Sequence, residues 1–465
     1  MAEAYAPDRP DPSDRVPWGL LGAAAVAGGL VALLGALGPA LQVAVVLGVG
    51  LGFPLLLLFV VRPHMALAAY LAALPLVLPV PLAGGLNAGE LLTLAILVLG
   101  ALSLWEARER VVEALFRLAP FLVPLAGLGV VSVVSLVVNG ITALEDVVSA
   151  LFKVLAFGLV AVLVHMHADT RGKARTLLAG AALGAALVAV YAVTAWLLGW
   201  SYSAEFDWNR ASGTFENWNL LGGFMALMSM PTLALAAMVR RRGVKLLLGT
   251  AFVLEILALL LSLTLGSLLG LVVGAGFTVL FLMEGGRKRV VPALVLGALA
   301  FGVAFSTNPQ LRDKVMRIDE RLNDRLITYA VGINMFRDRF WWGFGSEWRL
   351  AEELQLGEAD YGITSFGQAA IVPHNSFLKI GVEKGVMGVI LFTAVVLGAL
   401  HVLFRHRARL KRSPSAPLYY GTAAGVLAFL VQNMTNDILL HARIGIVFFV
   451  LLAVLDRVAM QTGEA

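Results

Sequence analysis

Long apolar runs of about 20 residues, separated by short polar loops, fill most of this chain. A helix of about that length crosses the hydrocarbon core of a bilayer and satisfies its own backbone groups there. The pattern therefore predicts an all-α polytopic membrane protein with 12 to 14 transmembrane helices. The fourteen predicted spans are residues 17–38, 40–61, 65–82, 91–105, 118–138, 147–166, 176–199, 218–239, 246–263, 267–284, 290–306, 380–403, 415–434 and 444–461.

Basic residues cluster at alternate ends of these apolar runs. The positive-inside rule places such clusters in the cytoplasm, and the even number of spans then puts both termini there as well. The clusters are Arg62/His64, Arg108/Arg110/Arg117, Arg171/Lys173/Arg175, Arg240/Arg241/Arg242/Lys245, Arg287/Lys288/Arg289 and Arg405/Arg407/Arg409/Lys411/Arg412.

One connection is much longer than the others and lies on the opposite, outer face of this topology. Apolar residues at helical spacing between Asp319 and Arg339 predict an amphipathic helix within it, and an aromatic, glycine-containing turn at 340–345 follows. We expect this connection to carry the functional site. The predicted divisions are a cytoplasmic tail at 1–16, a bundle of about eleven spans at 17–306, the outer loop region at 307–379, and C-terminal spans with a short tail at 380–465.

Composition excludes several classes of protein. With 59% hydrophobic residues and a mean hydropathy of +0.86, the chain is too apolar for a soluble domain. It has no cysteine, which excludes disulfides and thiolate sites, and its seven histidines form no HExxH-like pair. We therefore expect no metal or other cofactor, although carboxylate sites stay open. The net charge of +5 is accounted for by the loop clusters and indicates no nucleic-acid partner.

Two charged residues fall inside predicted spans. Glu255 and Lys153 are costly to expose to lipid, so both are expected to face the bundle interior. For Glu255 we expect a structural contact with a hydroxyl or a lysine. Lys153 lies near a span end, where a long side chain can also extend to the interface.

The polar outer region ends in a segment, residues 373–388, that combines a histidine with regularly spaced glycines. Pro373 suits the first turn of a helix, and Gly381, Gly385 and Gly388 follow His374 by 7, 11 and 14 residues. On a continuous helix those offsets return to one side, beneath the imidazole. Two interpretations remain open: a small-residue packing seam with an interfacial histidine, or a functional imidazole.

The order His374-Asn375, nine residues, then Gly385-x-x-Gly388 resembles the signature of bacterial O-antigen ligases, part of the O-antigen ligase/polymerase family of membrane glycosyltransferases. Two more segments are similar to recurring parts of this family. One is the Arg-x-x-Gly-Thr-Phe pattern that runs from Arg210 towards Asn217. The other is an arginine upstream of an acidic residue, a large apolar residue and Gly-x-Gly. Arg325, 49 residues before His374, fits that position, and Arg321 is the alternative one turn away.

The resemblance implies a GT-C-like helical bundle with a cavity on the periplasmic side of the bacterial inner membrane. It implies inverting, metal-independent transfer of a glycan from undecaprenyl diphosphate to a sugar hydroxyl of lipid A–core. Arg210 and Arg325 would hold the diphosphate, and His374 would act as general base or hydrogen-bond the phosphate. The remaining candidates for substrate binding are Asn375, Arg321, Asn217, Arg443 and Tyr329.

The chain departs from the family pattern at the hairpin between residues 264 and 267. Many members carry a Ser-Arg pair there, whereas this chain has Leu265-Gly266. Arg443, in the last outer loop together with Asp437 and His441, is the candidate replacement for the missing cation.

Other functions stay open. A polymerase of O-antigen or exopolysaccharide shares the fold and uses a second lipid-linked glycan as acceptor. A flippase or transporter would line its path with charges inside the spans, and few are present here. A sensor or assembly partner would keep the fold without the activity.

Overall fold

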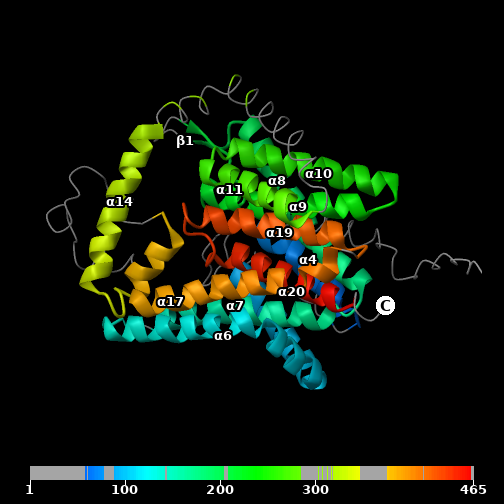
Figure 1. Cartoon of the computed structure of the whole chain (residues 1–465), viewed down its shortest axis with the longest axis horizontal. Helices are drawn as coiled ribbons and strands as arrows, with labels where there is room; N and C mark the ends of the chain where they lie inside the picture. Colours follow the sequence, from blue (N-terminus) through cyan, green and yellow to red (C-terminus); the bar gives the residue numbers. More distant parts are fainter. Residues whose placement is uncertain are drawn as a thin grey trace, which may run out of the picture.

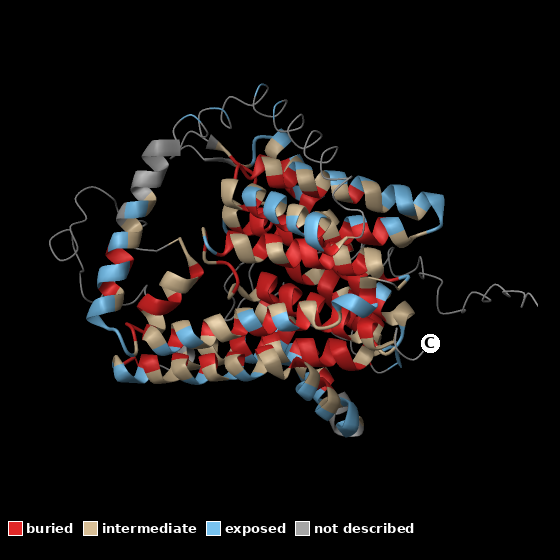
Figure 2. Ribbon diagram, viewed as in Figure 1, coloured by how far each residue is buried: buried red, intermediate tan, exposed pale blue. Residues whose placement is uncertain are grey.

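The helix at the centre of the computed structural model is the last in the chain, α20 (Ala442–Gln461) (Figure 1). It packs mainly on α7 (Leu144–His167) and also contacts α8 (Arg171–Leu197), α17 (Ser376–Phe404) and α19 (Ala416–Gln432). Almost all of α20 is buried (Figure 2). A helix surrounded by other helices is apolar on every side, which explains the apolar run at residues 444–455 of α20.

The structure describes residues 58–59, 61–77, 88–141, 144–203, 208–283, 318–345, 374–411 and 413–461, with positions 302, 306, 312 and 316. The predicted N-terminal tail and the predicted span 17–38 lie outside these residues, as do most of the predicted spans 40–61 and 290–306.

Other helices surround α20 and its neighbours in mostly antiparallel pairs. They are α4 (Pro63–Ala73, continued by a 3₁₀ turn at Leu74–Leu76), α5 (Ala88–Glu106), α6 (Arg108–Val138), α9 (Trp218–Met238), α10 (Arg242–Leu261), α11 (Leu265–Phe277, continued by a π turn at Thr278–Leu282) and α18 (Arg407–Lys411). Among them, α6 packs on α7 and α17, α9 on α10 and α19, α11 on α19, and α4 on α8.

Small residues allow two of these pairs to approach closely. A Cβ atom on Gly398 of α17 would lie 2.0 Å from the carbonyl oxygen of Pro120 in α6. A Cβ atom on Gly425 of α19 would lie 2.2 Å from the carbonyl oxygen of Leu227 in α9. Helices in lipid associate through such close packing rather than through hydrophobic exclusion of water.

The predicted all-α polytopic membrane architecture is confirmed. Among the described residues, eight helices are long and apolar enough to cross a membrane, and three shorter apolar helices accompany them. These elements coincide with eleven of the predicted spans. The strands described are two residues each, β1 (Tyr202–Ser203) and β2 (Trp208–Asn209), paired antiparallel. The total of 12 to 14 spans and the division into regions stay predictions.

Charged residues from the predicted cytoplasmic clusters gather at one end of the bundle. There Lys173 pairs with Asp169 at 2.7 Å, and Arg457 pairs with Glu113 at 3.2 Å. The predicted outer loops meet at the other end, as described below. The grouping agrees with the predicted topology, and the membrane side that each end faces stays a prediction.

The two charges inside spans behave differently. Glu255 is completely buried and accepts a hydrogen bond from the hydroxyl of Thr232 at 3.0 Å, so the predicted interior contact is confirmed. Lys153 is exposed, so the prediction that it faces the interior is wrong. Its long side chain can carry the ammonium group towards the interface, which removes the need for an internal partner.

The predicted amphipathic helix is α14 (Ile318–Asp338). It lies across the end of the bundle and is separate from the aligned helices of the bundle (Figure 1). Val331 and Met335 of α14 pack with Phe344 and Val382 in a small cluster against the beginning of α17. This contact places one face of α14 beside the segment that contains His374.

Candidate active site

The α17 helix begins after His374. Asn375 is its N-cap, and the Asn375 side chain accepts hydrogen bonds from the backbone N–H groups of Phe377 (2.9 Å) and Leu378 (3.1 Å). An asparagine cap stabilises a helix that begins at the following residue. The prediction that His374 lies on the helical face is therefore wrong, and Pro373 lies outside the described residues.

The α17 helix is also broken at Gly385, and residues 340–345 dock into the break. The backbone N–H of Phe344 donates to the carbonyl of Val382 at 2.8 Å, and that of Val386 donates to Phe340 at 2.7 Å. The predicted aromatic turn thus replaces helical hydrogen bonds that α17 has lost. The predicted continuous glycine seam is wrong because the middle glycine is not helical.

Gly385 has φ +65°, and a Cβ atom there would lie 2.3 Å from the carbonyl carbon of Trp341. Only glycine combines this backbone conformation with such close contact. The helix α6 completes the junction, because Ser135 donates to the carbonyl of Glu383 at 2.7 Å and Asn139 donates to that of Gly343 at 2.9 Å. The irregular backbone is therefore satisfied inside protein, as a membrane protein requires.

The loop between α19 and α20 joins the predicted site residues. The Asn375 amide donates to the carbonyl of Met434 at 3.0 Å, and Arg325 donates to that of Thr435 at 3.0 Å. The Tyr329 hydroxyl donates to the carbonyl of His374 at 3.3 Å. Four candidates predicted from the sequence thus meet at one loop.

The imidazole of His374 is half-buried and makes no hydrogen bond with the described part of the chain. Burial lowers its pKa below the usual 6.5, and the charges of Arg325 and Lys379 lower it further, against the opposing effect of Asp437. At neutral pH the ring is therefore uncharged and can accept a proton.

Arg325 is less buried than Arg210 and Arg443, the other candidate arginines whose side chains the structure describes. One N–H of its guanidinium binds Thr435, and its other donors meet no acceptor within the described ranges. Its planar group can bind two phosphate oxygens at once and stays charged at any relevant pH. Arg321, the alternative, lies one turn earlier on α14.

Arg210 and Asn217 are bonded within the protein. Arg210 is buried, donates to the carbonyl of Ser262 at 2.8 Å and 3.0 Å, and lies over the ring of Trp218 at 4.1 Å. Ser262 is the C-cap of α10, where a cation is favourable. Asn217 is the N-cap of α9 and accepts from Asn219 and Leu220. Their contact with substrate stays a prediction.

Arg443 is likewise buried and occupied. It forms an ion pair with Glu216 at 2.6 Å, donates to the carbonyl of Thr214 at 2.9 Å, and lies over the ring of Phe215 at 4.7 Å. Burial alone would raise the pKa of Glu216, but His441, at 3.3 Å, and Arg443 outweigh it and lower this pKa to about 2. The pair ties α20 to the loop before α9.

The 264–267 hairpin packs directly on the same late loop. A Cβ atom at Gly266 would lie 2.1 Å from the hydroxyl oxygen of Thr435, so a larger residue there would displace the loop. Because Arg325 donates to the carbonyl of Thr435, α14 brings a cation to this hairpin. The replacement of the missing hairpin arginine by Arg443 stays a prediction.

Sequence reasoning missed the organising role of Asn433 and Ser376. The backbone N–H of Ser376 donates to the carbonyl of Asn433 at 3.0 Å, and the Ser376 hydroxyl donates to its side chain at 2.8 Å. The available signal was the polar run Gln432-Asn433-Met434-Thr435-Asn436-Asp437 between two apolar helices. Among the described residues there is no group of three or more His, Asp or Glu arranged to hold a metal ion.

Comparison with known families gives one match relevant to this site. Residues 250–393 match the O-antigen ligase family, as the resemblance predicted. The matched region contains Arg321, Arg325, Tyr329, His374 and Asn375, but not Arg210, Asn217 or Arg443. No curated protein matches the chain. With its apolar helices, the match indicates a multi-pass bacterial membrane protein with O-antigen ligase or polymerase-type activity on a lipid-linked glycan and an acceptor.

Proposed function

We propose that this chain, which the match over residues 250–393 assigns to the O-antigen ligase family, transfers a glycan from undecaprenyl diphosphate to lipid A–core. The reaction would take place on the periplasmic side of the inner membrane. The observation that carries the proposal is that two groups meet at one loop, residues 433–436. The neutral imidazole of His374 has no hydrogen-bond partner among the described residues and precedes Asn375, which bonds that loop, and the guanidinium of Arg325 bonds the same loop.

In the proposed step, a hydroxyl oxygen of the acceptor sugar attacks the anomeric carbon of the donor glycan. The bond between that carbon and the diphosphate oxygen breaks, and the electron pair leaves with the diphosphate. Attack from the opposite side inverts the anomeric centre. The hydroxyl proton passes to the imidazole of His374 if the histidine is the general base, and otherwise to a phosphate oxygen.

Arg325 would bind the diphosphate and stabilise the negative charge that develops as it departs. Arg210 and Arg443 would act indirectly, because each bonds and fixes a loop that forms the site. Asn375, Tyr329 and Asn217 would fix the positions of the loops and present their remaining polar groups to the glycan.

The test is a transfer assay with the purified full-length protein in EDTA, using an undecaprenyl-diphosphate glycan with and without lipid A–core. Product that forms only with lipid A–core supports the ligase. Longer lipid-linked chains formed without that acceptor indicate the polymerase instead. Activity that requires added metal would overturn the metal-independent mechanism.

Arg325→Ala should reduce the rate by roughly 10²–10³-fold, the loss typical of removing a charge-stabilising donor. Arg337→Ala is the matched control, because Arg337 is an exposed arginine near the other end of α14. Equal activity in the two variants would exclude Arg325 from the reaction.

A further inference from the structure

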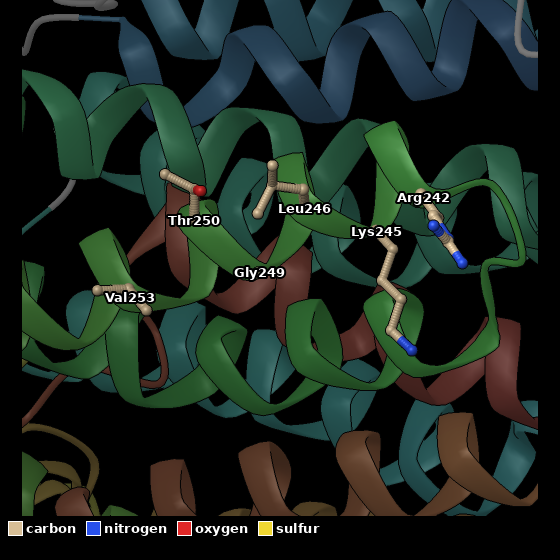
Figure 3. A pocket seen from close by; sticks show the side chains of 6 residues that line it. All are labelled: Arg242, Lys245, Leu246, Gly249, Thr250 and Val253. Atoms are coloured by element: carbon tan, nitrogen blue, oxygen red, sulfur yellow. The ribbon is translucent and has the colours of Figure 1, made fainter.

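A hollow lies on the surface of α10, and none of its lining residues belongs to the site just described (Figure 3). The described residues that line it are Arg242, Lys245, Leu246, Gly249, Thr250 and Val253. They lie between Arg242, the first residue of α10, and Val253, whereas the candidate active site contacts Ser262 at the other end of this helix.

The lining residues recur every three or four positions and therefore form one stripe along the helix. Positive charge is confined to one end of this stripe. Arg242 and Lys245 lie at that end and Val253 at the other, with Leu246, Gly249 and the uncharged Thr250 between them (Figure 3). A cationic end followed by an apolar stretch is the complement of a phospholipid with a negatively charged headgroup.

The cations are available for a ligand. Neither Arg242 nor Lys245 forms an ion pair within the described residues, and both are exposed. Arg240 and Arg241 precede them, and both are also exposed. A surface this positive at the end of a membrane helix attracts anionic headgroups.

The apolar part is also unfilled by the described chain. Leu246 is 73% exposed and Val253 is 60% exposed, and nothing lies within 4 Å of a Cβ atom built on Gly249. This part of α10 lies at the edge of the bundle, whose contacts with α10 come mainly from α9 and α8 (Figure 2). Gly249 thus leaves a notch beside Leu246, Thr250 and Val253.

The length of the stripe selects the ligand. From Arg242 to Val253 a helix rises about 16 Å, which is close to half of the roughly 30 Å hydrocarbon core. We propose that this stripe binds one anionic phospholipid, with its phosphate between Arg242 and Lys245 and one acyl chain along Leu246, Gly249 and Val253. A free phosphate ion would use only the cations, and would leave the apolar stripe without a role. The proposal is independent of the transfer reaction.

The experiment is native mass spectrometry of the purified full-length protein, titrated with dioleoyl phosphatidylglycerol or with dioleoyl phosphatidylcholine. We expect one phosphatidylglycerol to be retained and phosphatidylcholine to be lost. Arg242→Gln/Lys245→Gln should weaken retention on the order of tenfold or more, because each cation near a headgroup contributes appreciably. Inorganic phosphate at the same concentrations should not displace the lipid.

Arg407→Gln/Arg409→Gln is the matched control, since it removes two exposed cations from α18 at the same end of the bundle. Equal loss in both double variants would overturn the proposal and indicate non-specific surface charge. Gly249→Leu fills the notch on an exposed helix and keeps every charge, so it should also weaken retention while the fold persists. Unchanged retention in Gly249→Leu, or equal retention of the two lipids, would overturn the acyl-chain part or the headgroup part of the proposal.

Discussion

The two ends of the bundle both contain histidine, arginine and carboxylate side chains, but they use them in opposite ways. At the end that bears the basic clusters, Asp456 is completely buried and accepts from His165 and His406, each at 3.0 Å, and from Arg405. All four residues lie on or directly beside regular helices. At the loop end, His374 has no partner for its imidazole in the part of the chain that the structure describes, Arg325 has one there, and α17 is broken.

The polar residues at one end of the bundle stabilise the fold, and those at the other end are available for chemistry. A carboxylate with three donors has no capacity left for a substrate, so the Asp456 group holds helices together. An imidazole and a guanidinium with unused donors and acceptors are less stabilising but can bind a substrate. Charge in a membrane protein is costly in either place, so unsatisfied polar groups indicate function more strongly than charge itself does.

The largest effect is expected at His374. His374→Ala should reduce transfer by roughly 10²–10⁴-fold if the imidazole is the general base, with little change in thermal stability. His374→Gln keeps a hydrogen-bond donor but no base, so it should be as inactive as the alanine variant. Substantial activity in the glutamine variant would assign the ring to phosphate binding instead. His401→Ala, at an exposed position of α17, should behave as wild type in the same assay.

At the opposite end the change should appear in stability. Asp456→Ala removes the carboxylate that His165 and His406 bond and leaves the guanidinium of Arg405 without its counter-charge, so it should reduce the free energy of unfolding by about 3–5 kcal/mol. Glu113→Ala breaks the partly exposed pair with Arg457 and should cost less than about 1 kcal/mol. Unfolding in mixed micelles measures both. If Asp456→Ala were stable but inactive, the contrast between the two ends would fail.

The break in α17 should contribute to both properties. Gly385→Ala places a side chain at positive φ and against the Trp341 backbone, and should cost about 1–3 kcal/mol from backbone strain alone, with further loss from the overlap. Residues 340–345 follow α14 and dock into the break in α17, so their displacement would also move α14 and transfer should fall as well. Gly276→Ala is the control, since a Cβ atom there meets nothing within 4 Å. Thermal unfolding and transfer rate are measured on both variants, and wild-type values for Gly385→Ala would show that the break is dispensable.

The smallest effect concerns pH. Protonation removes the base, so transfer should decline as pH falls through the pKa of His374. Because that pKa lies below 6.5, transfer at pH 6.5 should exceed half of its plateau. Asp437→Asn removes the charge that raises this pKa and should move the midpoint to lower pH. An upward shift would contradict the assignment of the midpoint to His374.

Most of the fold follows from the sequence because the length of an apolar run is a direct physical requirement of the bilayer. The predicted spans in the described ranges, the α14 helix and the 340–345 turn all occur in the structure. The family resemblance identified Arg325, Tyr329, His374 and Asn375 as candidates from local patterns, and the structure brings these four residues together.

Helical periodicity gave a wrong prediction for α17, that of one continuous helical face with His374 and the three glycines. It assumes a continuous helix, whereas Asn375 begins the helix later and the docking of Trp341 makes a non-helical Gly385 favourable. Both causes are tertiary, and Trp341 lies outside the segment in which the glycine spacing was analysed. The bonding of Arg210 and Arg443 was also inaccessible, since their acceptors at Ser262 and Thr214 lie in other loops.

The central position of α20 constrains the order in which this protein can be made. The helix that fills the middle of the bundle is made after the other described helices, yet Arg443 binds the carbonyl of Val77, 366 residues earlier. His165 bonds Asp456, 291 residues later, and Ser376 at the start of α17 bonds Asn433. The contacts that Arg443 and Asp456 make with earlier helices and loops therefore form only after α20 has been synthesised.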